Sequence, residues 1–173
     1  MKKNNKLTGK KELTLQEKEE CQKCIDEMRL RHDNATLDFL QQFVHNNERG
    51  IHPKEFSQKA HLGRNLFYGV VKNRTRSLTN PCKLRIAIGL AIFWENIVTN
   101  HIILKIPRFE KSMDQKNYDE KVRKKEEQLK QDCIKHFGKD MQLAFGLKEQ
   151  GKDLDKIARY LKSLNNKQEN FKQ

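Results

Sequence analysis

The sequence predicts an all-α protein, on three observations. Apolar residues recur at helical spacing along most of the chain, and no stretch shows the apolar–polar alternation of a strand. Signals for helix ends recur along the chain: Thr14 with Glu17 forms a capping box, Pro53 and Pro81 suit first turns, and Gly138 suits a break. We therefore expect helices throughout and no sheet.

Composition predicts one core with charged extensions. Only 35% of the residues are hydrophobic and 34% are charged, so a core cannot run through all 173 residues. We expect a basic tail and an amphipathic helix over 1–33. A compact helical domain should occupy 34–107, and a charged helical extension 108–173.

The first two expected helices precede the centre of the chain. One begins at the capping box and runs from about Leu15 to His32, with an apolar stripe so thin that it needs a partner. The second covers residues 35–47 and ends before Gly50. Its inward-facing residues should be Leu37, Leu40, Phe43 and Val44.

Residues 56–73, FSQKAHLGRNLFYGVVKN, predict two short helices joined by a tight turn. The first of them begins at Pro53. The spacing of the apolar residues changes phase at 61–63, so one continuous helix would not keep them on one face. Two helices crossing steeply would bury them together: Phe56, Ala60, Leu62, Leu66, Phe67 and Val70.

Further helices are expected on the C-terminal side. One runs from Asn80 to about Phe93, and another from about Glu95 to Ile106, where Pro107 stops it. A highly charged helix over 116–136 ends at Gly138, and two shorter helices flank Gly151.

The charge favours a polyanionic partner for the middle of the chain, and an acidic protein partner or a membrane surface would also fit that charge. The formal net charge is +13 and the sequence pI is about 9.6. Residues 34–110 hold eleven Lys and Arg against five Asp and Glu, whereas residues 111–173 hold sixteen against eleven with the signs interleaved. The middle is therefore selectively basic, and the tail is typical of a solvated helical surface.

Residues 35 to about 105 resemble the lambda-repressor-like (XRE or Cro type) helix-turn-helix family. The resemblance rests on Ala60-His-Leu62-Gly-Arg64-Asn-Leu66-Phe67 across the turn and on the apolar run LRIAIGLAI over 84–92. It implies a five-helix domain that binds double-stranded DNA, with residues 64–73 as the recognition helix in the major groove.

The same resemblance implies the DNA-contacting residues. Arg64, Asn65 and Tyr68 would face base edges at the start of the recognition helix. Lys72, Arg74 and Arg76 would neutralise phosphates, and Lys54 and Gln58 would flank the groove from the preceding helix. The function expected is sequence-specific DNA binding by a bacterial or mobile-element transcription regulator.

Three residues depart from the family pattern and keep an alternative open. Pro53 stands where a phosphate-binding polar residue is usual, Gly63 offers no side-chain cap, and Gly69 weakens the helix that holds it. The alternative is a non-catalytic helical scaffold, or an RNA-binding accessory protein, that keeps the fold without reading bases.

Neither enzyme nor cofactor chemistry is expected. No nucleophile, zinc-protease or phosphate-loop motif occurs, and the six histidines are scattered. Cys21 and Cys24 have the spacing of metal ligands but lack a second pair, so small apolar packing and reduced thiols are the favoured interpretation. We expect no metal and no small-molecule substrate.

The remaining expectations concern location and assembly. No apolar run is long enough to cross a bilayer and no signal peptide is evident, so we expect a cytoplasmic protein without membrane contact. A homodimer through the C-terminal helices is expected, with the 116–136 helix supplying a seam of Val122, Leu129 and Cys133.

Overall fold

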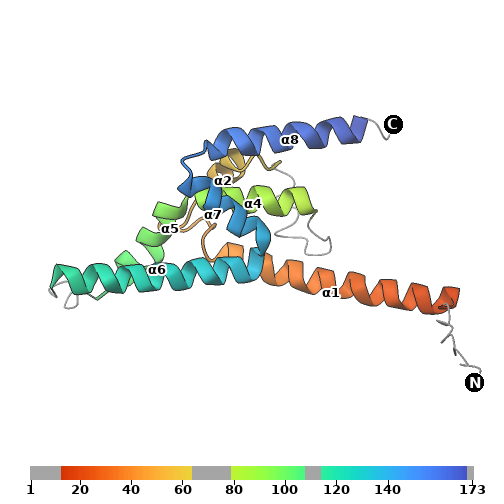
Figure 1. The fold of residues 1–173 in the computed structure, drawn as a ribbon, viewed down its shortest axis with the longest axis horizontal. Coiled ribbons are helices and arrows are strands. Elements are labelled where there is room, and N and C mark those ends of the chain that lie inside the picture. The colour runs from red at the N-terminus through yellow and green to blue at the C-terminus, as the bar shows by residue number, and fades with distance from the viewer. Residues whose placement is uncertain (1–12, 64–78, 108–113, 171–173) are drawn as a thin grey trace, which may run out of the picture.

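The computed structural model describes residues 13–63, 79–107 and 114–170. Within these ranges the chain is all-helical, with seven α-helices, one 3-10 helix and no strand (Figure 1). The elements are α1 (Leu15–Gln41), α2 (Pro53–Lys59), α4 (Asn80–Ile92), α5 (Trp94–His101), η1 (Ile103–Lys105), α6 (Gln115–Phe137), α7 (Lys139–Glu149) and α8 (Leu154–Asn170).

Helix α1 is one continuous helix of 27 residues, where the sequence suggested two. The expected start is confirmed: Thr14 accepts a hydrogen bond from the Glu17 backbone, and the Glu17 carboxylate accepts one from the Thr14 backbone at 2.8 Å. The expected break near residue 33 was wrong. No glycine or proline interrupts 15–41, and buried Asp33 forms an ion pair with Lys83 of α4, Nζ to Oδ1 2.7 Å.

The end of α1 also differs from the expected end near residue 47. The helix stops at Gln41, and the chain then forms an isolated β-bridge between Val44 and Ile51. The Ile51 backbone donates to Phe43 O at 2.9 Å, and the His45 backbone donates to Ile51 O at 3.1 Å. These hydrogen bonds satisfy backbone groups that a longer helix would have used.

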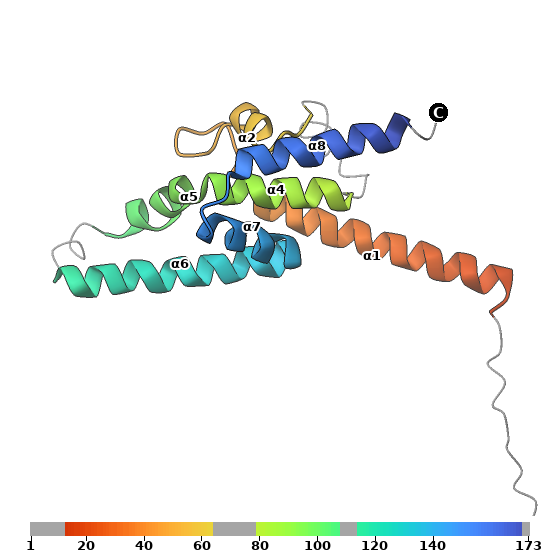
Figure 2. The same ribbon diagram turned by 45° about the horizontal axis from the view of Figure 1, so that its top comes forward.

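The N-terminal half of α1 extends away from the rest of the molecule (Figures 1 and 2). Every residue from Leu15 to Arg29 is exposed, including Met28 at 65%. Burial begins at Asp33 and continues through Leu40. The expectation that the thin apolar stripe of 15–32 needs a partner is therefore not met within the described chain, and α1 is anchored by its C-terminal half alone.

Helix α4 forms the centre of the core. It is flanked by α2, α7 and α8 (Figure 2), and Ala87, Ile88, Leu90 and Ala91 are fully buried on it. The core joins residues on both sides of the expected boundary at 107: Leu37, Leu40, Phe43, Phe56, Ala60, Ile86, Trp94, Ile97, Cys133, Phe137, Met141, Ala144, Phe145, Leu154 and Ala158. Residues 114–164 therefore complete the core that residues 33–106 begin.

Gly89 lets α2 approach α4 closely. A Cβ added at Gly89 would lie 2.8 Å from Phe56 Cζ and 2.9 Å from Ala60 Cβ, and both neighbours are fully buried. Both distances are shorter than real Cβ contacts. The glycine in LRIAIGLAI thus serves the contact between α2 and α4.

The segment after α4 contains two short helices instead of one. α5 ends at His101, and the chain continues as η1 to Lys105, whereas we expected an α-helix to Ile106. Trp94 fixes the start of α5: its ring packs edge-on against Phe145 of α7, centroids 4.9 Å apart, and its Nε1 donates to Glu126 Oε1 of α6 at 2.8 Å.

The C-terminal helices lie close to the expected positions. Gly138 (φ 60°) separates α6 from α7, and Gly151 (φ 70°) separates α7 from α8. Both glycines adopt the left-handed conformation that permits these breaks. Of the proposed seam on α6, Cys133 is fully buried in the chain's own core and Leu129 packs against it.

Candidate nucleic-acid interface

The short helix α2 presents one apolar and one polar face. Pro53 occupies its first turn as expected, and the His52 side chain caps it by accepting from the Lys54 backbone at 3.2 Å. Phe56 and Ala60 are buried against Gly89 of α4, and Ser57 is buried as well. The opposite face is exposed and mixed in charge, and holds Lys54, Glu55, Gln58 and Lys59.

A turn follows α2 at residues 60–63, which we call the elbow; the second helix predicted after it lies outside the described residues. His61 has φ 53°, and it is the only residue other than glycine with positive φ in the described ranges. This conformation is strained for a residue with a Cβ and usually needs support from its surroundings. The Leu62 backbone donates to Ser57 O at 2.9 Å, and Leu62 is 6% exposed.

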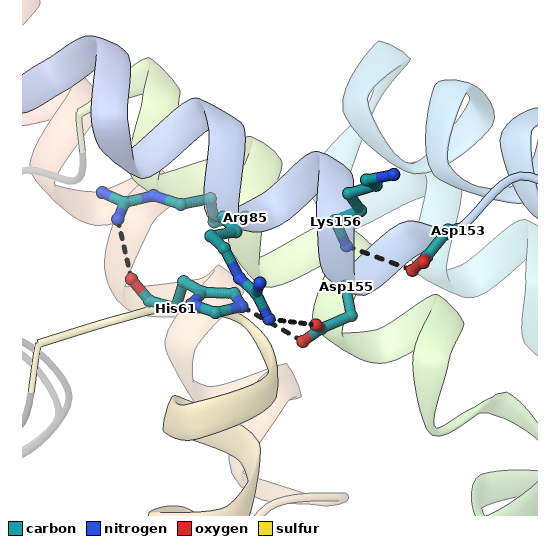
Figure 3. Close-up of polar contacts among 6 residues, drawn as sticks. His61, Arg85, Asp153, Asp155 and Lys156 are labelled. Carbon is teal, nitrogen blue, oxygen red and sulfur yellow. Dashed lines mark hydrogen bonds and ion pairs between the residues drawn. The ribbon is translucent and has the colours of Figure 1, made fainter.

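Two distant helices hold His61 in this elbow (Figure 3). Arg85 of α4 donates from Nη1 to His61 O at 2.9 Å and from Nε to Pro81 O at 3.3 Å. On α8, Asp155 Oδ1 accepts from His61 Nε2 at 3.1 Å. Because a carboxylate can only accept here, Nε2 carries a proton in this contact.

The electrostatic surroundings of Asp155 stabilise its charged form. The hydrogen bond from His61 is the main cause that lowers the pKa of Asp155 below its ordinary value of 3.8, and the charges of His61, Arg159 and Lys59 add to it. Arg159 also pairs with Asp155, Nη2 to Oδ2 3.2 Å. Cationic groups from α2 and α8 and the elbow histidine thus surround one carboxylate.

The structure places two of the eight expected DNA-contacting residues. Lys54 and Gln58 are both exposed on α2 and stand one turn apart on the helix. The other six lie outside the described residues: Arg64, Asn65, Tyr68, Lys72, Arg74 and Arg76. Gly69 lies there too. Gly63 is the last described residue before the expected recognition helix.

Sequence reasoning missed the residues that support the elbow. Arg85 lies 24 positions after His61 in the sequence, and Asp155 lies 94 positions after it. The one available signal was Arg85 itself, the single charge inside an apolar run, which had to find polar partners if buried. It is 8% exposed.

The remaining candidates for site chemistry are metal ligands and thiols. Within the described ranges no group of three or more His, Cys, Asp or Glu side chains could hold a metal ion. Cys21 and Cys24 are exposed on α1, whereas burial raises the pKa of Cys82 to about 11 and that of Cys133 to about 12. The expected packing role therefore fits Cys82 and Cys133, and not Cys21 or Cys24.

None of the described helices is long and apolar enough to cross a bilayer alone. By length and composition, Pro81–Ile92 and Trp94–Lys105 qualify together as a pair bent by 65°.

Comparisons with models of protein families, with curated proteins and with solved structures found no match to this chain.

Proposed function

We propose that this protein binds double-stranded DNA through a helix-turn-helix and regulates transcription. The first helix is α2, the turn is the elbow at 60–63, and residues 64–73 are the recognition helix. The observation that carries the proposal is the elbow. The positive φ of His61 forms a turn there, immediately before the segment that resembles a recognition helix.

The surroundings of the elbow support this proposal. A recognition helix must be held rigidly to read bases, and Arg85 and Asp155 tie the turn to α4 and α8. The exposed face of α2 offers Lys54 and Gln58 for phosphates beside the groove. Net charge supplies the long-range attraction to DNA.

In this proposal Arg64, Asn65 and Tyr68 contact base edges while Lys72, Arg74 and Arg76 neutralise phosphates. The bound protein acts sterically, by blocking or recruiting polymerase. A homodimer formed through the C-terminal helices would double the contact with a two-fold symmetric site.

The test is selection from random-sequence duplex DNA at several salt concentrations. We expect an enriched motif, and we expect R64A and N65A to abolish the enrichment while K125Q on α6 keeps it. Binding with a steep salt dependence but no enriched motif would instead indicate sequence-independent binding. Absence of binding to any duplex at physiological salt would refute the proposal.

The scaffold alternative rests on Pro53, Gly63 and Gly69, which depart from the family pattern. An RNA-binding role belongs with it, because a basic surface does not by itself distinguish the two nucleic acids. Parallel binding measurements with duplex RNA and single-stranded RNA separate these possibilities from the main proposal.

A further inference from the structure

Helix α8 presents a basic outer face beside the elbow. Its inner side packs on the core through Leu154 and Ala158, with Ile157 and Leu161 partly buried. Much of the rest of its surface is exposed, and we call four residues on it the α8 outer face: Lys156, Arg159, Tyr160 and Lys162. Tyr160 is 62% exposed and stands one turn after Lys156.

The neighbouring acids leave this face positive. Asp153 Oδ1 accepts from the Lys156 backbone at 3.1 Å and so caps the start of α8. Asp155 is occupied by His61 and Arg159. Among the described residues neither Lys156 nor Lys162 forms an ion pair, so both ammonium groups are available to a partner in solution.

Helix α6 provides the contrast. It holds seven Lys and Arg against five Asp and Glu, with the signs interleaved. Some of its lysines pair with acids one turn away, as Lys124 does with Glu120 at 3.2 Å and Lys130 with Glu126 at 3.8 Å. Both views place α6 on the opposite side of the molecule from α2 and α8 (Figures 1 and 2).

We infer that the α8 outer face is a second phosphate-binding surface, which contacts the backbone of the same DNA duplex beside the recognition helix. The contact between Asp155 and His61 joins α8 to the turn from which that helix starts (Figure 3). Lys162 stands seven residues beyond Asp155, or about 10 Å along the helix axis.

The major groove is about 12 Å wide, so a helix inside it has a phosphate strand close on either side. Lysine and arginine bind phosphates without reading sequence, and a tyrosine hydroxyl can donate to the same oxygens. The α8 outer face would therefore add affinity and fix the orientation of the protein, without adding base specificity.

This inference rests on the proposed function, and its test separates the two. The variant K156Q/K162Q removes two unpaired cations but leaves Arg159, Asp155 and His61 in place. The control is K116Q/K125Q, which removes two exposed cations from α6. Thermal unfolding of both variants checks that the fold is intact, and binding is measured with the selected duplex between about 0.05 and 0.3 M salt.

We expect K156Q/K162Q to bind about tenfold more weakly near 0.15 M salt, with a slope of log affinity against log salt that is shallower by about 1.8. Its selected motif should be that of the wild type, and the control should match the wild type throughout.

An unchanged slope and affinity in K156Q/K162Q would overturn the inference. The proposed function would still stand if the wild type selects an enriched motif. An equal loss in the control would overturn the inference too, since it would indicate a diffuse charge effect. If the wild type binds no DNA duplex, both proposals are overturned. Binding to RNA alone would count as this outcome.

Discussion

His61 Nε2 lies 3.1 Å from Asp155 Oδ1 and thereby joins the elbow after α2 to α8, across 94 positions of sequence. The contact is part-buried: the side chain of His61 is 19% exposed and that of Asp155 is 37% exposed. It holds a backbone conformation that is unusual for a residue with a side chain. The conformation of His61 is therefore supported by a residue outside residues 35–105, the segment that resembles a helix-turn-helix.

The first prediction concerns acid stability. Because the pKa of Asp155 is below 3.8 in the folded protein, folding favours its charged form. This stabilisation is complete above pH 3.8 and is lost as the pH falls through the lowered pKa. The wild type should exceed D155N in free energy of unfolding at pH 6, and the difference should shrink below pH 3.8.

Urea denaturation followed by the fluorescence of Trp94, the single tryptophan of the chain, measures this difference. Other acids titrate alike in both proteins and cancel in the comparison. A difference that stays constant from pH 6 to pH 3 would contradict the role assigned to the Asp155 carboxylate.

The second prediction concerns Gly89. We expect G89A to destabilise the protein by about 1–2 kcal/mol, because crowding against Phe56 and Ala60 outweighs the higher helix propensity of alanine. G146A in α7 is the matched control, since a Cβ there meets nothing within 4 Å. It should stabilise by up to about 1 kcal/mol. Equal effects of the two variants in urea denaturation would refute the close approach.

The third prediction concerns the ion pair between Lys83 and Asp33. K83M leaves the Asp33 carboxylate buried without its lysine, so we expect a loss of about 2 kcal/mol, reduced from the value for a fully buried pair because Lys83 is 25% exposed. K54M, at an exposed lysine of α2, should change stability by less than about 0.5 kcal/mol. If D33N/K83M loses as much as the two single variants together, the pair does not interact as described.

The fourth prediction concerns the thiols. In the native protein an aromatic disulfide reagent should react quickly with Cys21 and Cys24, which are exposed. Cys82 and Cys133 should react only after unfolding, because burial both shields them and raises their pKa values to about 11 and 12. Counting the released chromophore before and after adding urea gives two and then four thiols; four fast thiols would contradict the buried positions.

Local signals predicted much of the fold. The capping box at Thr14, the proline at 53 and the glycines at 138 and 151 act within a few residues, so the sequence locates them directly. The end of α1 was missed because the bridge between Val44 and Ile51 decides it, and a pairing between separate segments leaves no periodic pattern.

The same distinction applies to the candidate site. The resemblance implied Lys54 and Gln58, and the structure places them one turn apart on the exposed face of α2, while their role in DNA binding stays a prediction. Arg85 and Asp155 were missed as partners of His61, since only the packing of α4 and α8 around α2 brings them together. A contact between distant positions requires the fold to be known first.

The exposed half of α1 extends from the residue, Asp33, at which the helix enters the core. At 1.5 Å per residue, positions 15–32 extend about 27 Å beyond that residue. Asp33 is the first buried residue along α1, and its contact with Lys83 is where the core begins to hold the helix. A tilt of α1 by about 10° at Asp33 would displace the N-terminal end of the helix by roughly 5 Å. A small change in the core would therefore shift the position of that end.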